Sequence, residues 1–117
     1  MQPYEQVKRV WGHYKVLFED SNEVKVKQLV CDPGSSLSLQ RHFDRKEFWL
    51  ITEGTAYVNT LNAQGELVTM GPYNKFDTLF IDYEEWHQLV NKDTIPLKIV
   101  EIQYGRNCVE EDIERKQ

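Results

Sequence analysis

The segment 34–54 constrains the fold of this chain most, because its residues follow the pattern of two strands joined by a polar turn. Before the turn, apolar and polar residues alternate. Gln40 and His42 are two positions apart there, so on a strand their side chains point to the same face. Residues 43–46 form the polar turn, and residues 48–51 are a β-prone run. The pattern predicts two adjacent strands that direct polar side chains toward one pocket.

Four polar side chains on or beside these strands have the chemistry of metal ligands. Gln40 offers an amide oxygen, His42 an imidazole and Glu47 a carboxylate, and His87 in a later β-prone segment offers a second imidazole. This mixed oxygen and nitrogen set suits a divalent metal of intermediate softness and leaves positions for water or substrate. Gln40, His42, Glu47 and His87 are therefore candidate ligands of one metal site, and for either histidine a solvent-facing or hydrogen-bonded role stays open. Two further alternatives stay open: Gln40 as a hydrogen-bond donor behind the ligands, and Asp44 as a substitute ligand rather than a solvated turn residue.

The rest of the chain consists of short β-prone segments separated by turn residues. Turns are expected at residues 32–34, 62–65 and 71–74, and only the tail, residues 109–116, has helical potential. Short strands at regular intervals favour a sandwich or a small barrel. We predict one all-β domain over residues 1–117, with further strands at 24–31, 55–61, 67–70, 78–81, 87–91 and 97–104.

Composition excludes several classes of protein. A length of 117 residues allows one hydrophobic core. The formal net charge of −5 argues against nucleic-acid binding, which normally needs a basic face. No apolar run approaches the ~18–20 residues of a membrane helix, and the N-terminus lacks the core of a signal peptide. Cys31 and Cys108 are far apart and form no CxxC pair. We expect a cytoplasmic protein with free thiols and no membrane partner.

The residues singled out above resemble the two cupin motifs. A glycine, two ligands separated by one residue, a glutamate and a second glycine match the first motif, and His87 with Asn91 matches the second. The chain further resembles the C-terminal cupin domain of type II mannose-6-phosphate isomerases, which is usually fused to a mannose-1-phosphate guanylyltransferase. Their patterns RPWGxY, SLSLQxHHHRxEHW and IPLxxIEVQxGxxxxEDDI are similar to residues 9–14, 36–49 and 95–113. The resemblance implies a single cupin domain, a jelly-roll barrel also called a double-stranded β-helix.

The resemblance also implies an activity and a cofactor. The reaction would interconvert mannose 6-phosphate and fructose 6-phosphate through a cis-enediol, with one divalent metal ion. Zinc is our first choice, and manganese, cobalt, nickel, iron and magnesium are alternatives. Arg45 matches the arginine of the second pattern, so we expect it on the turn as a catalytic residue that also binds the phosphosugar. Trp49 should share the face of Glu47 and wall the sugar pocket, although a core role fits it equally. No residue stands out as the general base.

Several departures from the family pattern bear on the substrate. The triple histidine becomes His42-Phe43-Asp44, and residues 82–86 replace the proline and glycine that normally precede the second histidine. Glu84 and Glu85 in that loop are expected to border the pocket and to oppose an anionic phosphate. The acidic residues 110–112 near the end of the chain are expected to form a solvated cap.

Two other classes of function remain open from the sequence. One is a non-catalytic or differently specific metal-binding cupin that binds a sugar or small carboxylate, or regulates a partner. The other is an oxygenase in which His42, Glu47 and His87 hold iron. An isomerase would serve sugar-nucleotide or surface-polysaccharide supply. Exposed strand edges in a small β-domain also lead us to expect a homodimer.

Overall fold

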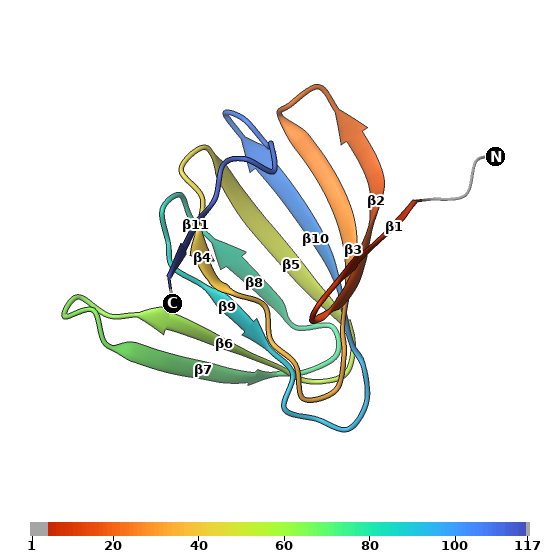
Figure 1. Cartoon of the computed structure of the whole chain (residues 1–117), viewed down its shortest axis with the longest axis vertical. Coiled ribbons are helices and arrows are strands. Elements are labelled where there is room, and N and C mark those ends of the chain that lie inside the picture. The colour runs from red at the N-terminus through yellow and green to blue at the C-terminus, as the bar shows by residue number, and fades with distance from the viewer. Residues whose placement is uncertain (1–4, 117) are drawn as a thin grey trace.

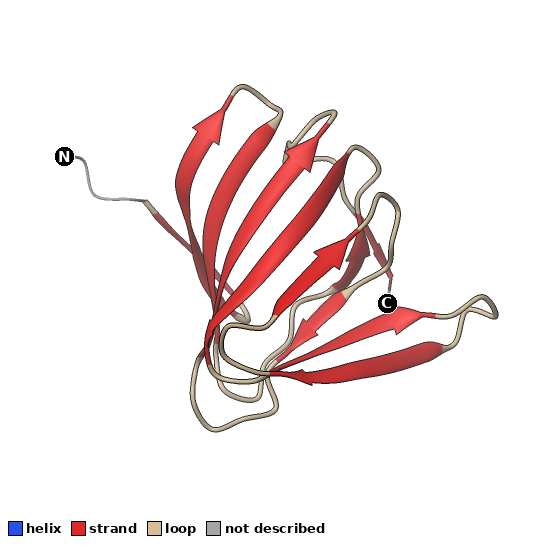
Figure 2. Ribbon diagram, turned by 180° about the vertical axis from the view of Figure 1, so that it is seen from behind, coloured by secondary structure: helices blue, strands red, loops and turns tan. Residues whose placement is uncertain are grey.

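The computed structural model describes residues 5–116, and every regular element in this range is a strand. This confirms the all-β prediction (Figures 1 and 2). The helical potential assigned to the tail is wrong, because its last residues pair with the short strand β4 instead. The strands are β1 (Gln6–Arg9), β2 (Gly12–Asp20), β3 (Val24–Cys31), β4 (Leu39–Arg41), β5 (Arg45–Glu53), β6 (Ala56–Leu61), β7 (Leu67–Tyr73), β8 (Thr78–Ile81), β9 (Gln88–Val90), β10 (Leu97–Gly105) and β11 (Glu114–Lys116).

The strands form two facing layers. One layer is a six-stranded sheet in the order β1-β2-β3-β10-β5-β8, and the other contains β7-β6-β9 and the pair β11-β4. Isolated bridges, Ser36 to Val90 and Gln40 to His87, join the β4 segment to β9. Figure 1 shows the long strands of the first layer fanned out opposite the shorter strands of the second. The first and last strands therefore lie at edges of different layers, with β1 at the edge of one and β11 at the edge of the other.

Alternation along the two central strands gives the barrel interior an apolar end and a polar end. In β5 and β10 every second side chain is buried. Toward one end these inward side chains are Ile51, Ile99 and Leu97, each of which stabilises the fold by about 1.5–3 kcal/mol through burial. Toward the other end the inward side chains of the same strands are polar: Arg45, Glu47, Glu101 and Gln103. The polar end of the interior is where a binding site can form.

Two glycines are required where backbones approach closely. Gly12 has a φ of +147°, and a Cβ there would lie 2.0 Å from the carbonyl oxygen of Val30. Gly54, the second glycine of the cupin-like segment, has a φ of +85°, and a Cβ there would lie 2.8 Å from the carbonyl oxygen of Pro96. Any other residue would be strained at both positions and would push neighbouring strands apart.

Most predicted strands are present, and the differences have a tertiary cause. β5 begins at Arg45 because Arg45 pairs with Gly105 of β10, so the predicted turn over 43–46 is shorter than expected. The predicted turn over 71–74 is wrong in its first part, since residues 71–73 continue β7. A register shift between Ala56 and Val58 in the partner strand accommodates them. No helix within residues 5–116 is long and apolar enough to cross a membrane.

Candidate metal centre

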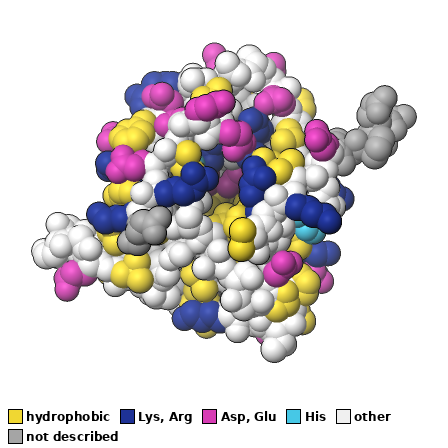
Figure 3. Space-filling model, viewed as in Figure 1, with side chains coloured by type: hydrophobic (Ala, Val, Ile, Leu, Met, Phe, Trp, Pro, Cys, Tyr) yellow, Lys and Arg dark blue, Asp and Glu magenta, His cyan; other side chains and the backbone are white. Residues whose placement is uncertain are grey.

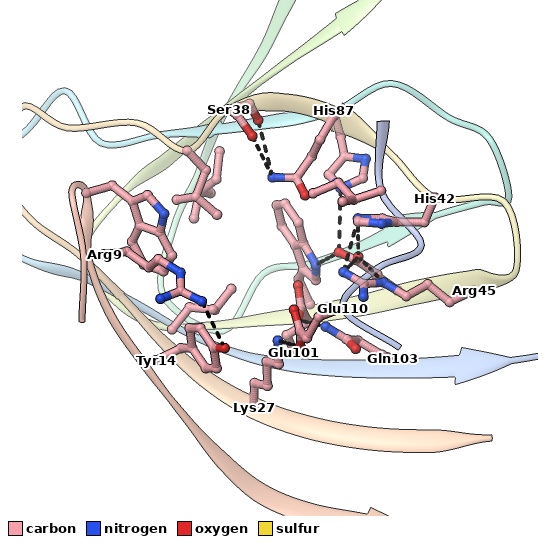
Figure 4. A pocket seen from close by; sticks show the side chains of 18 of the residues that line it. Arg9, Tyr14, Lys27, Ser38, His42, Arg45, His87, Glu101, Gln103 and Glu110 are labelled. Carbon is pink, nitrogen blue, oxygen red and sulfur yellow. Dashed lines mark hydrogen bonds and ion pairs between the residues drawn. The ribbon is translucent and has the colours of Figure 1, made fainter. Parts of the chain in front are cut away.

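Three of the four predicted ligands converge at the polar end of the barrel. His42 follows β4, Glu47 lies in β5, and His87 precedes β9 and forms a bridge with Gln40. Nε2 of His42 is 3.2 Å from Oε2 of Glu47, and Nε2 of His87 is 3.7 Å from Oε1 of the same carboxylate. One ligand atom from each residue lies within 4.8 Å of the others, and all three residues are buried. Figure 4 shows the two imidazoles directed at the same point of the cavity.

This geometry fits a metal ion. Ligand atoms bound at about 2.0–2.2 Å lie about 3.0–3.4 Å apart in neighbouring coordination positions. The two separations from the Glu47 carboxylate, 3.2 and 3.7 Å, are close to that range. Nδ1 of His42 is 2.6 Å from the carbonyl oxygen of Asp112, and Nδ1 of His87 is 2.8 Å from that of Glu85. A carbonyl oxygen can only accept, so each Nδ1 donates its proton and each Nε2 is left as the ligand atom.

Arg45 is buried beside the ligands and does not lie on a solvated turn. Its Nη2 is 3.0 Å from Oε2 of Glu47 and 3.0 Å from Nε2 of His42, and its Nε is 3.1 Å from the same Glu47 oxygen. The guanidinium therefore donates to lone pairs that a metal ion would also use. A metal ion bound by Glu47 and His42 would displace the guanidinium from these atoms and leave it available to another anion.

The electrostatics of the site keep His42 and Glu47 in the protonation states that a metal ion requires. Burial lowers the pKa of His42 to about 4, although the charge of Glu47 opposes the shift, so this imidazole is neutral at pH 7. Burial alone would raise the pKa of Glu47, but His87, Arg45 and His42 outweigh it and hold that pKa far below its ordinary value. Glu47 is therefore a carboxylate, and His42 has a free lone pair, before any metal arrives.

Trp49 points into the barrel, as predicted. It is 1% exposed, and its indole N–H donates to Oε1 of Glu47 at 2.9 Å. Its ring also meets His87 edge-on, with the centroids 5.9 Å apart. Trp49 therefore lines the cavity and orients the Glu47 carboxylate, and it is also a buried side chain of the core.

Gln40 and Asp44 lie differently with respect to the three converging residues. Gln40 lines the same cavity, and its amide nitrogen donates to the backbone and hydroxyl oxygens of Ser38 at 3.3 Å. Its carbonyl oxygen is therefore the atom available to a ligand. Asp44 instead pairs with Arg106 at 3.2 Å on the surface, which agrees with a turn residue and not with a ligand.

Several polar residues that line the cavity were not predicted as site residues, among them Glu101, Gln103, Lys27 and Glu110. Glu101 and Gln103 are inward residues of β10, and Nε2 of Gln103 donates to Oε1 of Glu101 at 2.6 Å. Burial and then the charge of Glu47 raise the pKa of Glu101 to about 8. Polar residues on the otherwise apolar face of β10 were the available signal for this pair. The other two are Lys27 of β3 and Glu110, whose Nζ and Oε1 atoms are 2.6 Å apart.

Of the residues predicted to form a solvated cap, Glu110 and Glu111 are exposed, but Glu110 also pairs with Lys27 and Lys25, and Asp112 binds the loop that carries His42. The prediction that the loop before His87 borders the cavity is wrong. Glu84 is exposed, and the carboxylate of Glu85 accepts from the backbone N–H of Asp82. Neither acid lines the cavity, so neither opposes an anion there.

The cavity has a volume of about 220 Å³ and opens to solvent. Its floor holds the three converging residues together with Trp49. Three of its lining residues are exposed and define the mouth: Arg9, Glu110 and Arg115. Figure 3 shows Lys and Arg side chains on both sides of a hollow with an acidic group at its bottom.

Solved structures with this architecture define the class of the fold. The capsular polysaccharide assembling protein CapF from Staphylococcus aureus superposes with a TM-score of 0.85 at 12% identity, over 100% of this chain and 35% of CapF. Oxalate decarboxylase from Bacillus subtilis, whose structure was studied for its Mn(II) centres, gives a TM-score of 0.78 at 18% identity, over 95% of this chain and 29% of that one. The fold is that of the cupins, the double-stranded β-helix.

Within that class the sequence identifies the family. The chain belongs to the family described as Mannose-6-phosphate isomerase C-terminal, whose model matches residues 1–117. The Alginate biosynthesis protein AlgA of Pseudomonas putida is 37% identical over 114 residues, which cover 97% of this chain and 22% of AlgA. A mannose-1-phosphate guanylyltransferase of Salmonella muenchen is 34% identical over 94% of this chain and 22% of its own length. The chain thus spans about a fifth of the length of these relatives.

Proposed function

We propose that this protein is a metal-dependent phosphosugar isomerase that interconverts mannose 6-phosphate and fructose 6-phosphate through a cis-enediol. The observation that carries the proposal is the convergence of His42, Glu47 and His87 in the buried end of the cavity. Backbone carbonyl oxygens accept from Nδ1 of both histidines and so turn each Nε2 toward the centre of the site. The family and its relatives in alginate and mannose-phosphate metabolism support the choice of substrate. His42, Glu47 and His87 would hold one divalent ion, with zinc as the first choice and Gln40 as the fourth ligand.

The residues of the chain have separate roles in this proposal. When bound, the metal supplies a Lewis acid that polarises oxygens at C1 and C2 of the open-chain sugar. Trp49 holds the Glu47 carboxylate and closes one wall of the cavity against water. Arg45, once released from Glu47 and His42, is placed to stabilise negative charge on a sugar oxygen during proton transfer between the two carbons.

A coupled isomerase assay tests the proposal. Purified protein is stripped of metal and reloaded with zinc, manganese, cobalt, nickel, iron or magnesium, and turnover of mannose 6-phosphate is followed. We expect turnover that depends on a metal and is lost in His87→Ala. His13→Ala is the matched control, because His13 lies in β2 and does not line the cavity. Failure of every metal to give turnover, with metal still bound by the wild type and lost in His87→Ala, would refute the isomerase assignment.

That second outcome would instead support a metal-binding cupin that recognises a sugar or small carboxylate without isomerising it. The engagement of Arg45 with Glu47 and His42 favours this candidate, because the cation then serves to hold the ligands and not the substrate. Substitution of Arg45 by glutamine separates the two candidates. It should abolish turnover in an isomerase, but should leave ligand binding in place in a binding protein.

The proposal also covers the setting of the protein. We expect an isomerase of this kind in the cytoplasm, where it would serve the supply of sugar units for surface polysaccharides, as the relatives in alginate and xanthan biosynthesis suggest. We also expect a homodimer, because β8 and β7 are edge strands of their sheets. Light scattering coupled to gel filtration tests the dimer directly: a mass near 13.9 kDa would contradict it.

A further inference from the structure

The mouth of the metal cavity is formed by two arginines from opposite ends of the chain. Arg9 is the last residue of β1, and Arg115 is the middle residue of β11. These strands are edges of different layers, so the cavity opens between them. Figure 4 shows Arg9 across the cavity from His42 and Arg45, with its guanidinium bonded to Tyr14. Both arginines are exposed, whereas the metal-binding residues below them are buried.

The charges of these two arginines are not compensated by carboxylates. Arg9 donates to the carbonyl oxygen of Lys8 and to the hydroxyl of Tyr14, which are both neutral acceptors. Within residues 5–116 no carboxylate lies within ion-pair distance of Arg9 or Arg115. Glu110, the third exposed residue of the mouth, is neutralised by Lys27 at 2.6 Å and Lys25 at 3.6 Å. The mouth therefore carries an unpaired positive charge.

The cations deeper in the cavity differ from those at the mouth. Arg45 is paired with Glu47 at 3.0 Å and Lys27 with Glu110 at 2.6 Å, so the anionic end of a ligand is attracted to the unpaired arginines at the mouth. The walls nearer the floor offer neutral hydrogen-bonding groups, such as the side chains of Ser38 and Gln40. A ligand that matches this distribution has an uncharged polyhydroxyl end and an anionic end, and enters with the uncharged end first.

We propose that Arg9 and Arg115 bind the phosphate group of a sugar phosphate at the mouth of the cavity and direct its unphosphorylated end toward His42, Glu47 and His87. Planar guanidinium groups bind phosphate oxygens in pairs, which gives orientation as well as affinity. The identity of the sugar rests on the proposed isomerase function. The phosphate site itself rests on the charges at the mouth and can be tested without turnover.

Isothermal titration calorimetry on the full chain tests this site with three probes: mannose 6-phosphate, mannose and inorganic phosphate. Arg9→Gln and Arg115→Gln should each weaken the binding of mannose 6-phosphate and inorganic phosphate by about tenfold or more, since each removes hydrogen bonds to a charged group. Lys8→Gln and Lys116→Gln are matched controls, because each removes one positive charge from the same strand at a residue that does not line the cavity. These controls should bind both phosphates within about twofold of the wild type.

The outcomes separate this inference from the proposed function. Phosphate binding that weakens in both arginine variants but not in the lysine variants supports the site, even in a protein without isomerase activity. In an active protein, Arg9→Gln should raise KM for mannose 6-phosphate. Equal binding of phosphate by the arginine and lysine variants would overturn the inference, and so would a wild type that binds mannose as tightly as mannose 6-phosphate.

Discussion

Replacement of Asp112 by alanine would remove the contacts by which the C-terminal segment orients His42, one of the proposed metal ligands. The Asp112 carboxylate accepts hydrogen bonds from the backbone N–H groups of Phe43 at 3.0 Å and Asp44 at 2.8 Å. Its carbonyl oxygen accepts from Nδ1 of His42 at 2.6 Å. The two side-chain bonds keep the segment against the His42 loop, so the carbonyl bond depends on them. We expect Asp112→Ala to lower both stability and metal affinity.

The magnitudes follow from these bonds. Hydrogen bonds to charged groups contribute about 1.5–3 kcal/mol each. Asp112 is half-buried, so we take the lower end and expect a loss of about 3 kcal/mol in the free energy of unfolding for Asp112→Ala. Asp112→Asn keeps one acceptor oxygen and should lose about half as much. A loosened ligand orientation should in addition weaken metal binding about 10–100-fold.

The assay is chemical denaturation with and without zinc, at a zinc concentration about 100 times the wild-type Kd. Zinc should then stabilise the wild type by about 2.7 kcal/mol, and Asp112→Ala by only about 0.4–1.4 kcal/mol. Glu111→Ala is the control, since Glu111 is an exposed neighbour whose carboxylate has no ion pair within residues 5–116. If zinc stabilised Asp112→Ala as much as the wild type, the C-terminal segment would not orient His42, and the reasoning would be refuted.

Three further predictions concern other buried groups. Glu47→Gln leaves the buried Arg45 guanidinium without its carboxylate, so the free energy of unfolding of the metal-free protein should fall by about 3–5 kcal/mol. A decrease below about 1 kcal/mol would contradict this. Burial alone would raise the pKa of Glu110, but the charge of Lys27 outweighs burial and lowers the pKa in the folded chain. The ion pair therefore stabilises the fold fully above pH 4.5, the ordinary pKa of the group, and this stabilisation is lost as the pH falls below that value. Denaturation between pH 6 and pH 3 should therefore show a shallower loss of stability in Glu110→Gln than in the wild type, and parallel curves would argue against the pair. Burial, and then the charge of Asp32, raise the pKa of the Cys31 thiol to about 11, and Cys108 is 2% exposed. A thiol reagent at pH 8 should therefore label neither cysteine until the protein unfolds. Rapid labelling of the native protein would be inconsistent with this burial.

The positions of Gln40, His42 and Glu47 were predictable because they depend on local periodicity. On a strand, alternation decides which side chains share a face, and a buried apolar face specifies that alternation. The same rule predicted that Trp49 would point inward with Glu47, and both are buried. Polar residues that interrupt such a face, as Glu101 does in β10, indicate a site by the same logic.

The environment of Arg45 and the role of the tail could not be predicted from local patterns. A turn and the start of a strand look alike at residues 43–46, and the pairing of Arg45 with Gly105 decides that β5 begins there. The acidic tail has the composition of a solvated segment. Its contacts with Lys27 and with the His42 loop join residues that are 83 and 70 positions apart.

The sequence by itself therefore determined the all-β architecture and which side chains face the interior, since both follow from patterns with a period of two residues. It also determined the family, through ordered motifs that extend along the chain. The tertiary structure alone decided that Arg45 bonds to Glu47 and His42, that Asp112 orients His42, and that Arg9 and Arg115 line the same cavity. These contacts depend on how strands distant in the sequence pair and close the barrel, and no local pattern encodes that pairing.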